Sequence, residues 1–145
     1  MEFEENSRII AIDFGEVRIG IAVTDPLKIF AYPLRTISND DKVFQNIKGI
    51  LSEYNCSLII IGLPLKESGE HSLITEKVLQ FKEKLSEHTK LPIKMVDERY
   101  SSSIAQQRVL EKVKSKKKRR DKSLIDKNAA AVILEDYLSS SKEWF

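Results

Sequence analysis

The sequence predicts one α/β domain over residues 1–145, with a mixed sheet of five strands and helices on both faces. Two short, isoleucine-rich segments lie close together near the start of the chain, and residues 58–61 form a nearly continuous apolar run. Segments with helical periodicity alternate with the later strands. The chain has 145 residues, of which 41% are hydrophobic and 32% charged, so it can bury one sizeable core.

The first strands form a hairpin. Residues 8–14 and 18–24 have strand composition, and Gly15 stands in the short connection between them. A connection this short predicts antiparallel pairing. A third strand is expected at residues 32–37, at an edge of the sheet, because Pro33 cannot donate a ladder hydrogen bond.

Helices and strands then alternate. Ser38, Asn39 and Asp40 offer N-cap residues for a first helix. Its predicted buried face consists of Val43, Ile47, Ile50, Leu51 and Tyr54. The run at 58–61 is typical of a central strand covered on both faces. A second helix should start near Ser72 and bury Ile74, Val78, Phe81 and Leu85.

The last third of the chain continues this pattern. A strand is expected at 93–97, a helix at 104–113 and a closing helix at about 126–138. The closing helix should turn Ala129, Ala130, Ile133, Leu134 and Tyr137 toward the sheet. Strands joined through helices imply parallel neighbours, whereas the opening hairpin is antiparallel, so the sheet is mixed.

Several classes of protein are disfavoured. The longest apolar run, residues 58–65, is far shorter than the roughly 20 residues of a membrane span. The acidic start of the chain does not resemble a secretory signal, and the single cysteine, Cys56, fits a reducing compartment. A cytoplasmic protein without a membrane partner is therefore expected. The two histidines, 17 residues apart, lack the spacing of a zinc site.

Positive charge is concentrated in one segment. Residues 112–122 carry eight basic side chains and one acidic one, whereas the rest of the chain has 16 basic and 21 acidic residues. Such a segment is a candidate contact for the phosphates of a nucleic acid. A charged loop that only contacts solvent is the alternative explanation. The candidate phosphate contacts in it are Lys114, Lys116, Lys117, Lys118, Arg119, Arg120 and Lys122.

Three acidic residues are candidates for catalysis. Asp13 ends the first strand on the face of Ile9 and Ala11, where an apolar residue would be expected. Glu98 follows the last strand, and the carboxyl ends of strands are where ligands bind in open α/β sheets. Asp126 opens the closing helix on its sheet-facing side. Taken singly, each is also explained as a turn cap, a surface ion pair or a first-turn acid.

Together the three carboxylates predict metal chemistry. If the closing helix packs over the first strand and the fourth or fifth, Asp13, Glu98 and Asp126 converge. Crowded carboxylates repel one another unless a cation such as Mg²⁺ or Mn²⁺ binds between them. Two such ions, about 3.5–4 Å apart, can activate a water and stabilise the leaving oxygen of a phosphodiester. A carboxylate cluster beside a basic segment thus predicts a metal-dependent nuclease.

Four motifs resemble one family. Residues 10–22 (IAIDFGEVRIGIA), 60–65 (IIGLPL), 97–101 (DERYS) and 125–138 resemble, in this order, motifs of the YqgF family. That family consists of bacterial ribonuclease H-like proteins described as pre-16S rRNA processing nucleases and as Holliday junction resolvase homologues. The motifs span nearly the whole chain, so the resemblance is specific.

The resemblance implies a ribonuclease H-like fold with the first strand in the centre of the sheet. It also implies that Asp13, Glu98 and Asp126 are metal-binding, catalytic positions. Arg18 and Arg99, within two of the motifs, join the candidate nucleic-acid contacts. The expected function is processing of the 5′ end of pre-16S rRNA in ribosome biogenesis.

Other functions stay open at this stage. A Holliday junction resolvase acting on branched DNA would need two sites related by symmetry, hence a homodimer, whereas trimming an RNA end needs one site. The sequence does not distinguish monomer from homodimer. A nucleic-acid-binding module without catalysis is a third possibility, disfavoured because all three acidic residues are present. The opening strand also resembles the phosphate loop of actin-like ATPases, but those need two such domains.

Overall fold

The computed structural model describes residues 6–97 and 122–142, and the side chains of 122–127 and 141–142 are not among those described. Its elements, in chain order, are β1 (Arg8–Asp13), β2 (Arg18–Thr24), β3 (Ala31–Ser38), α1 (Val43–Glu53), β4 (Cys56–Leu63), α2 (Leu73–His88), β5 (Ile93–Asp97) and α5 (Lys122–Lys142). The helix predicted at 104–113 lies outside the described residues.

Within the described part of the chain, five strands form a mixed sheet in the order β3-β2-β1-β4-β5. The first strand is thus central, as the resemblance implies for a ribonuclease H-like fold. β1 pairs antiparallel with β2, where Asp13 lies opposite Gly20, and parallel with β4. β4 pairs parallel with β5, where Leu63 lies opposite Asp97. The carboxyl ends of β1, β4 and β5 therefore meet at one edge of the sheet, called the carboxyl edge below.

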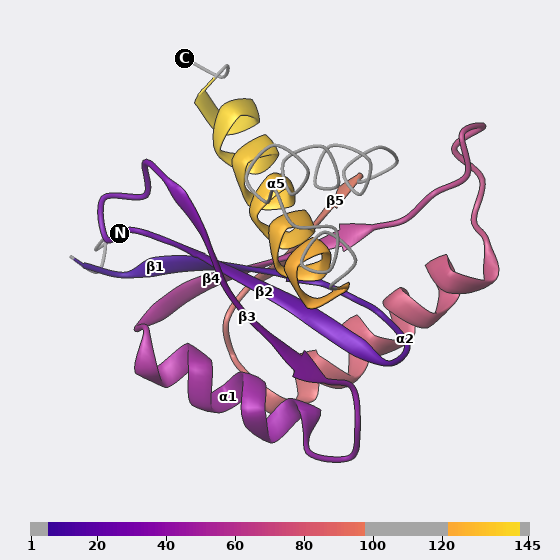
Figure 1. Ribbon diagram of the computed structural model, residues 1–145, viewed down its shortest axis with the longest axis horizontal. Coiled ribbons are helices and arrows are strands. Elements are labelled where there is room, and N and C mark those ends of the chain that lie inside the picture. Colours follow the sequence, from indigo (N-terminus) through magenta and orange to yellow (C-terminus); the bar gives the residue numbers. More distant parts are fainter. Residues whose placement is uncertain (1–5, 98–121, 143–145) are drawn as a thin grey trace.

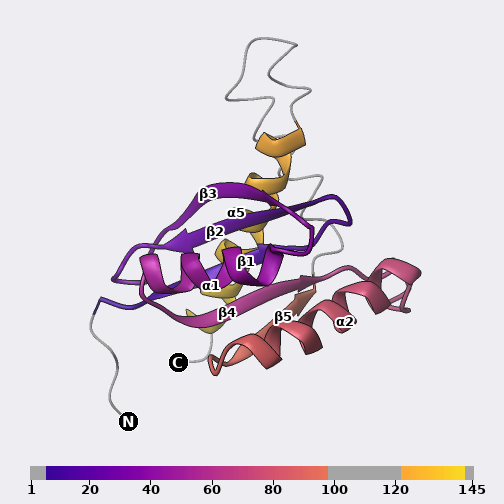
Figure 2. The ribbon, with the colours of Figure 1, turned by 90° about the horizontal axis from the view of Figure 1, so that it is seen from below.

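One face of the sheet is covered by α1 and α2 (Figures 1 and 2). Ile10 and Ile12 of β1 project to this side, because side chains alternate along a strand. They pack in one buried cluster with Ile47 of α1 and with Val78 and Leu85 of α2. Most of the predicted core positions are confirmed, since Val43, Ile47, Ile50 and Leu51 of α1 and Val78, Phe81 and Leu85 of α2 are buried, whereas Tyr54 and Ile74 are only partly buried.

The other face of the sheet is covered by α5 (Figures 1 and 2). Ile9 and Ala11 pack there with Ile60 of β4 and with the α5 residues Ala130, Ala131, Ile133, Leu134 and Leu138. Ala129 and Val132 are also buried, so residues 129–134 of α5 form an unbroken buried run. A helix buried on more than its sheet-facing side lacks a clear amphipathic pattern, as here.

Some details differ from the predictions. The N-cap of α1 is Lys42, with no side-chain cap, although the carboxylate of Asp40 accepts a hydrogen bond from the Lys42 backbone N–H at 3.0 Å. α5 begins at Lys122, before Asp126, and β4 is longer than the apolar run that predicted it. β3 lies at the sheet edge with Pro33, as expected.

No helix within residues 6–97 or 122–142 is long and apolar enough to cross a membrane.

Candidate active site

Asp13 is the last residue of β1, at the carboxyl edge. Its side chain is half-buried and belongs to the α5 face, the face of Ile9 and Ala11. Glu98 is the residue after β5 in the sequence and lies outside the described residues. Asp126 lies within α5, but its side chain is not described. The convergence of the three carboxylates thus stays a prediction.

The direction of α5 bears on that prediction. Near its carboxyl end, Leu138 lines a pocket with residues 29–32, at the start of β3. The start of β3 pairs with the end of β2, so both lie at the end of the strands opposite the carboxyl edge and Asp13. Asp126 precedes Leu138 by twelve residues, about 18 Å along a helix axis. α5 therefore runs with its amino-terminal turns toward the carboxyl edge, over β1, β2 and β3 and only marginally over β4.

The packing of α5 corrects one part of the sequence hypothesis. The predicted convergence assumed a closing helix over the first strand and the fourth or fifth; α5 does contact β1 and β4, but its main contacts are with β2 and β3. Contact with β5 is made through a side chain: Lys94 donates a hydrogen bond to the Tyr137 hydroxyl at 3.3 Å. The small side chains at 129–131 allow the helix to lie close to the antiparallel half of the sheet.

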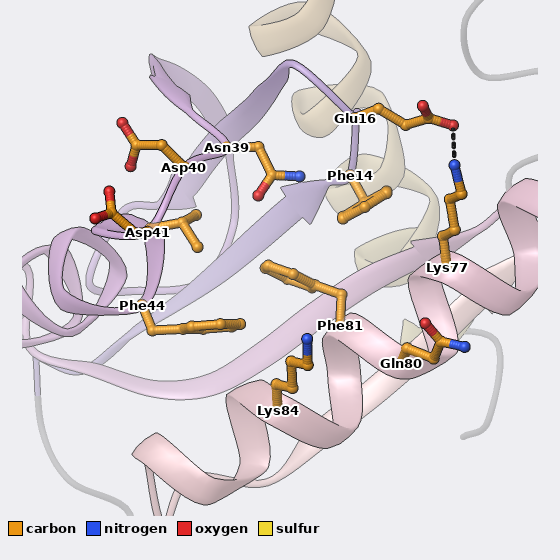
Figure 3. Close-up of a pocket in the computed structure, with 11 residues that line it drawn as sticks. Phe14, Glu16, Asn39, Asp40, Asp41, Phe44, Lys77, Gln80, Phe81 and Lys84 are labelled. Atoms are coloured by element: carbon orange, nitrogen blue, oxygen red, sulfur yellow. Dashed lines mark hydrogen bonds and ion pairs between the residues drawn. The ribbon is translucent and has the colours of Figure 1, made fainter.

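The turn after Asp13 is held from two sides. Gly15 has no room for a side chain, because a Cβ there would collide with the carbonyl oxygen of Arg18. Asn39, directly after β3, donates from Nδ2 to the Gly15 carbonyl at 2.8 Å. On the other side, Lys77 of α2 pairs with Glu16 at 2.9 Å (Figure 3). These contacts limit the freedom of the backbone that carries Asp13.

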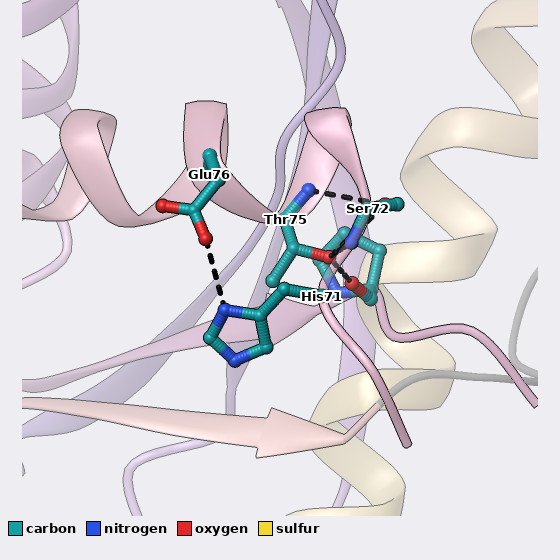
Figure 4. A network of polar contacts seen from close by, with 5 residues as sticks. His71, Ser72, Thr75 and Glu76 are labelled. Carbon is teal, nitrogen blue, oxygen red and sulfur yellow. Dashed lines mark hydrogen bonds and ion pairs between the residues drawn. The ribbon is translucent and has the colours of Figure 1, made fainter. Parts of the chain in front are cut away.

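The start of α2 is also anchored at the carboxyl edge. Ser72 and Thr75 form a capping box, in which each side chain accepts a hydrogen bond from the backbone N–H of the other (Figure 4). The Thr75 hydroxyl donates to the carbonyl of Pro64, the residue after β4. His71 contacts Glu76 at 2.9 Å on the surface. The Gly-Leu-Pro segment of the second motif is thereby tied to α2.

A cleft opens beside the turn that follows Asp13. It has a volume of about 570 Å³ and lies between this turn, the start of α1 and one face of α2 (Figure 3). Phe14, Phe44 and Phe81 line it together with charged and amide side chains. The sequence did not predict this cleft, because its lining comes from three distant segments. The only signal was the predicted burial of Phe81.

Asp25 and Cys56, two described residues away from the carboxyl edge, have shifted pKa values. Burial acts to raise the pKa of Asp25, but backbone N–H groups of Phe30, Ile29 and Leu27 outweigh it and lower that pKa from its ordinary value. Burial raises the pKa of the Cys56 thiol to about 11, although Arg8 partly opposes this.

Among the described side chains, no three metal-ligating residues form a cluster. Two of the three predicted ligands, Glu98 and Asp126, have side chains outside that set. The basic segment 112–121, Arg99 and the Lys122 side chain lie outside it too, so the described side chains of the predicted site are Asp13 and Arg18.

Comparison with solved structures defines the fold. Solved structures with the same fold include RuvC of T. thermophilus in complex with a Holliday junction substrate, with a TM-score of 0.57, 12% identity and coverage of 93% of this chain and 96% of that one. The Holliday junction resolvase of fowlpox virus matches with a TM-score of 0.54 and 13% identity, over 92% of this chain and 99% of the other. These likenesses establish a ribonuclease H-like fold.

Closer relatives identify the family. Residues 7–140 match the family RuvX, described as Holliday junction resolvase. A protein of Sulfurihydrogenibium sp. (strain YO3AOP1) named "Putative pre-16S rRNA nuclease" is 41% identical over 91% of this chain and 90% of its own length. A protein of the same name from Desulforamulus reducens is 42% identical over 92% and 97%. The chain belongs to the RuvX family, which is also called YqgF and is the family that the four sequence motifs resemble.

Proposed function

We propose that this protein is a metal-dependent nuclease that processes the 5′ end of pre-16S rRNA. The observation that carries the proposal is Asp13, a half-buried carboxylate at the carboxyl edge of the central strand, in a chain of the RuvX family. Relatives about 40% identical over nearly the whole chain carry the name of a pre-16S rRNA nuclease.

Mg²⁺ or Mn²⁺ fits the proposed ligands. Asp13, Glu98 and Asp126 are all carboxylates, the oxygen donors that these hard cations prefer. Bound ions would supply a nucleophilic water and stabilise the charge on the leaving oxygen. The chain itself would hold the carboxylates in place: Asp13 on the central strand, Asp126 on α5, whose direction brings its first turns toward the same edge.

Substrate binding is assigned to basic residues. Arg18 is the first residue of β2 and stands two residues before Gly20, which pairs with Asp13. The backbone of Arg18 therefore lies at the carboxyl edge. Residues 112–122 and Arg99 would contact phosphates further along the nucleic-acid strand, through an electrostatic attraction that does not depend on base sequence. We assign the protein to the cytoplasm, where precursor rRNA is made and where a lone buried cysteine stays reduced.

A second candidate function is resolution of branched DNA. The description of the RuvX family as Holliday junction resolvase favours it. Cutting a four-way junction symmetrically requires two active sites related by a two-fold axis, and therefore a homodimer, whereas RNA trimming requires one. The oligomeric state thus separates the two functions.

The test compares both substrates in one experiment. Labelled precursor rRNA and a synthetic four-way junction are incubated with the protein in Mg²⁺ or Mn²⁺, with and without EDTA. We expect cleavage of the RNA near its 5′ end, no cleavage with EDTA, and none by a folded Asp13→Asn variant. Asp136→Asn, which changes an exposed acid of α5, is the matched control and should cut normally. Cleavage of the junction alone would favour the second function, and activity of Asp13→Asn would exclude Asp13 as a ligand.

A further inference from the structure

The cleft beside Asp13 has the form of a ligand site. Its volume of about 570 Å³ lies within the range of small-molecule pockets, roughly 300–1,000 Å³. Phe14, the residue after Asp13, is part of its wall. Phe14, the residue after β1, packs with the core cluster on the α1 and α2 side, whereas Asp13, the last residue of β1, projects to the α5 side. The cleft therefore lies next to the proposed catalytic site at the carboxyl edge, but on the other side of the sheet.

The wall of the cleft is aromatic. The ring centroids of Phe14 and Phe81 are 5.1 Å apart, and those of Phe81 and Phe44 are 5.3 Å apart. His88 stacks on Phe44 at 4.8 Å with nearly parallel rings. Phe81 is buried, whereas Phe14 and Phe44 are only half-buried and keep ring surface toward the cleft (Figure 3). A flat ring entering the cleft can contact the parts of Phe14 and Phe44 that Phe81 and His88 leave accessible.

The rim of the cleft selects against phosphate. Lys77 is paired with Glu16 at 2.9 Å, which neutralises that ammonium. Asp40 and Asp41 stand at the α1 side, and Lys84 and the amide of Gln80 at the α2 side (Figure 3). An anionic group would meet more carboxylates than free ammonium groups. A neutral ring carrying N–H donors would find carboxylate and amide acceptors.

We propose that this cleft binds an unstacked nucleobase of a single-stranded segment next to the cleaved phosphodiester. Bases of single strands are commonly held by stacking on aromatic side chains, whereas bases inside a duplex are not accessible in this way. The backbone would cross the carboxyl edge at Asp13 while the neighbouring base turns toward Phe44. This inference rests on the proposed nuclease function and adds a requirement for single-stranded substrate at the cut.

The test measures binding without cleavage. A single-stranded RNA with one 2-aminopurine is titrated with the full chain in EDTA, and the fluorescence of that base reports stacking. The same RNA annealed to its complement is the second probe. We expect the single strand to bind more tightly. Phe44→Leu, which keeps an apolar side chain but removes the flat ring, should weaken binding about tenfold, since stacking on one aromatic contributes roughly 1–3 kcal/mol.

The control is Phe30→Leu. Phe30 is exposed and lines another pocket, at the end of the strands opposite the carboxyl edge. It should bind as the wild type does. Gln80→Leu, at an exposed rim position, removes an amide acceptor, should weaken binding two- to threefold and covers the case in which Phe44→Leu fails to fold. Equal affinity of wild type and Phe44→Leu, or duplex binding as tight as single-strand binding, would overturn the inference. Because these measurements contain no metal, failure of the nuclease assignment would show separately, in the Asp13→Asn cleavage assay.

Discussion

Asn39 donates a hydrogen bond from its side-chain Nδ2 to the carbonyl of Gly15 at 2.8 Å, and its backbone N–H donates to Val17 at 2.9 Å. Both acceptors belong to the turn between β1 and β2, which begins one residue after Asp13. Asn39, the residue after β3, thus holds the turn between β1 and β2, although, among the described strands, β3 itself pairs only with β2. This relationship connects a residue outside the motifs to the geometry of the proposed catalytic carboxylate.

Replacing Asn39 should impair both stability and catalysis. Asn39→Ala removes one half-buried hydrogen bond, which contributes about 0.5–1.5 kcal/mol, and should lower Tm by a few degrees. If the bond positions Asp13, kcat should also fall while KM changes little. Asn46→Ala, on the exposed side of α1, is the control and should behave as wild type. A variant at Asn39 with unchanged Tm and kcat would show that the bond positions nothing.

Asp25 should make stability depend on pH. Its carboxylate accepts backbone N–H bonds from Leu27 at 3.1 Å, Ile29 at 2.9 Å and Phe30 at 2.7 Å, and these bonds lower its pKa from the ordinary value. A lowered folded-state pKa means that the stabilisation is complete above the unfolded pKa and is lost as pH falls through the folded one. Asp25→Asn should thus lower Tm at pH 7 but not at the most acidic pH.

The measurement is thermal unfolding of wild type and Asp25→Asn from pH 7 downward. Asp41→Asn, an exposed acid before α1, is the control. A difference in Tm that stays constant over the whole pH range would show that the ionised form of Asp25 adds nothing to the turn between β2 and β3.

Cys56 should be unreactive in the folded protein. It is 7% exposed, and burial raises its pKa to about 11, so very little thiolate is present at pH 8. Since the thiolate is the reactive form, labelling with a disulfide reagent at pH 8 should be about a hundredfold slower in buffer than in denaturant. Labelling at the same rate in both would contradict the buried position of Cys56 at the start of β4.

The sequence predicted the sheet and its two faces well because periodicity reports burial directly. Alternation along β1 separated Ile10 and Ile12 from Ile9 and Ala11, and the structure packs these pairs against different helices. The position of α5 was less predictable. Its predicted inward residues Ala129, Ala130, Ile133 and Leu134 are buried, but an apolar helix face does not indicate which strands lie beneath it. The start of α5 at Lys122 was missed because Asp126 resembled a first-turn acid.

The candidate site was predictable only in part. The strand order brings the end of β1 beside the end of β4, and β5 ends next to that, so the carboxyl edge followed from the fold. The cleft could not be predicted, because Phe14, Phe44 and Phe81 meet only through tertiary packing. Likewise, nothing in the local sequence around Asn39 indicated its bond to Gly15.

The basic segment should contribute electrostatic binding without sequence preference. Replacing Lys116, Lys117, Lys118, Arg119 and Arg120 by glutamine should weaken binding to unrelated RNAs alike. The slope of log K against log salt should decrease in magnitude by roughly 0.7–0.9 for each phosphate that the protein no longer neutralises. Replacing Lys28, Lys48, Lys66, Lys82 and Lys90 by glutamine removes the same charge elsewhere and is the control. An unchanged slope in the segment variant would show that residues 112–122 contact only solvent.

The central claim, that Asp13, Glu98 and Asp126 form one metal site, is tested most directly by thermal unfolding with increasing Mg²⁺ or Mn²⁺. Ligands that bind the native state raise Tm, and three carboxylates without a cation repel one another. The Tm of wild type should therefore rise with metal. Without metal, Asp13→Asn, Glu98→Gln and Asp126→Asn should each have a higher Tm than wild type, and added metal should raise their Tm less. Four proteins whose Tm is indifferent to millimolar metal would contradict the claim and favour a binding module without catalysis.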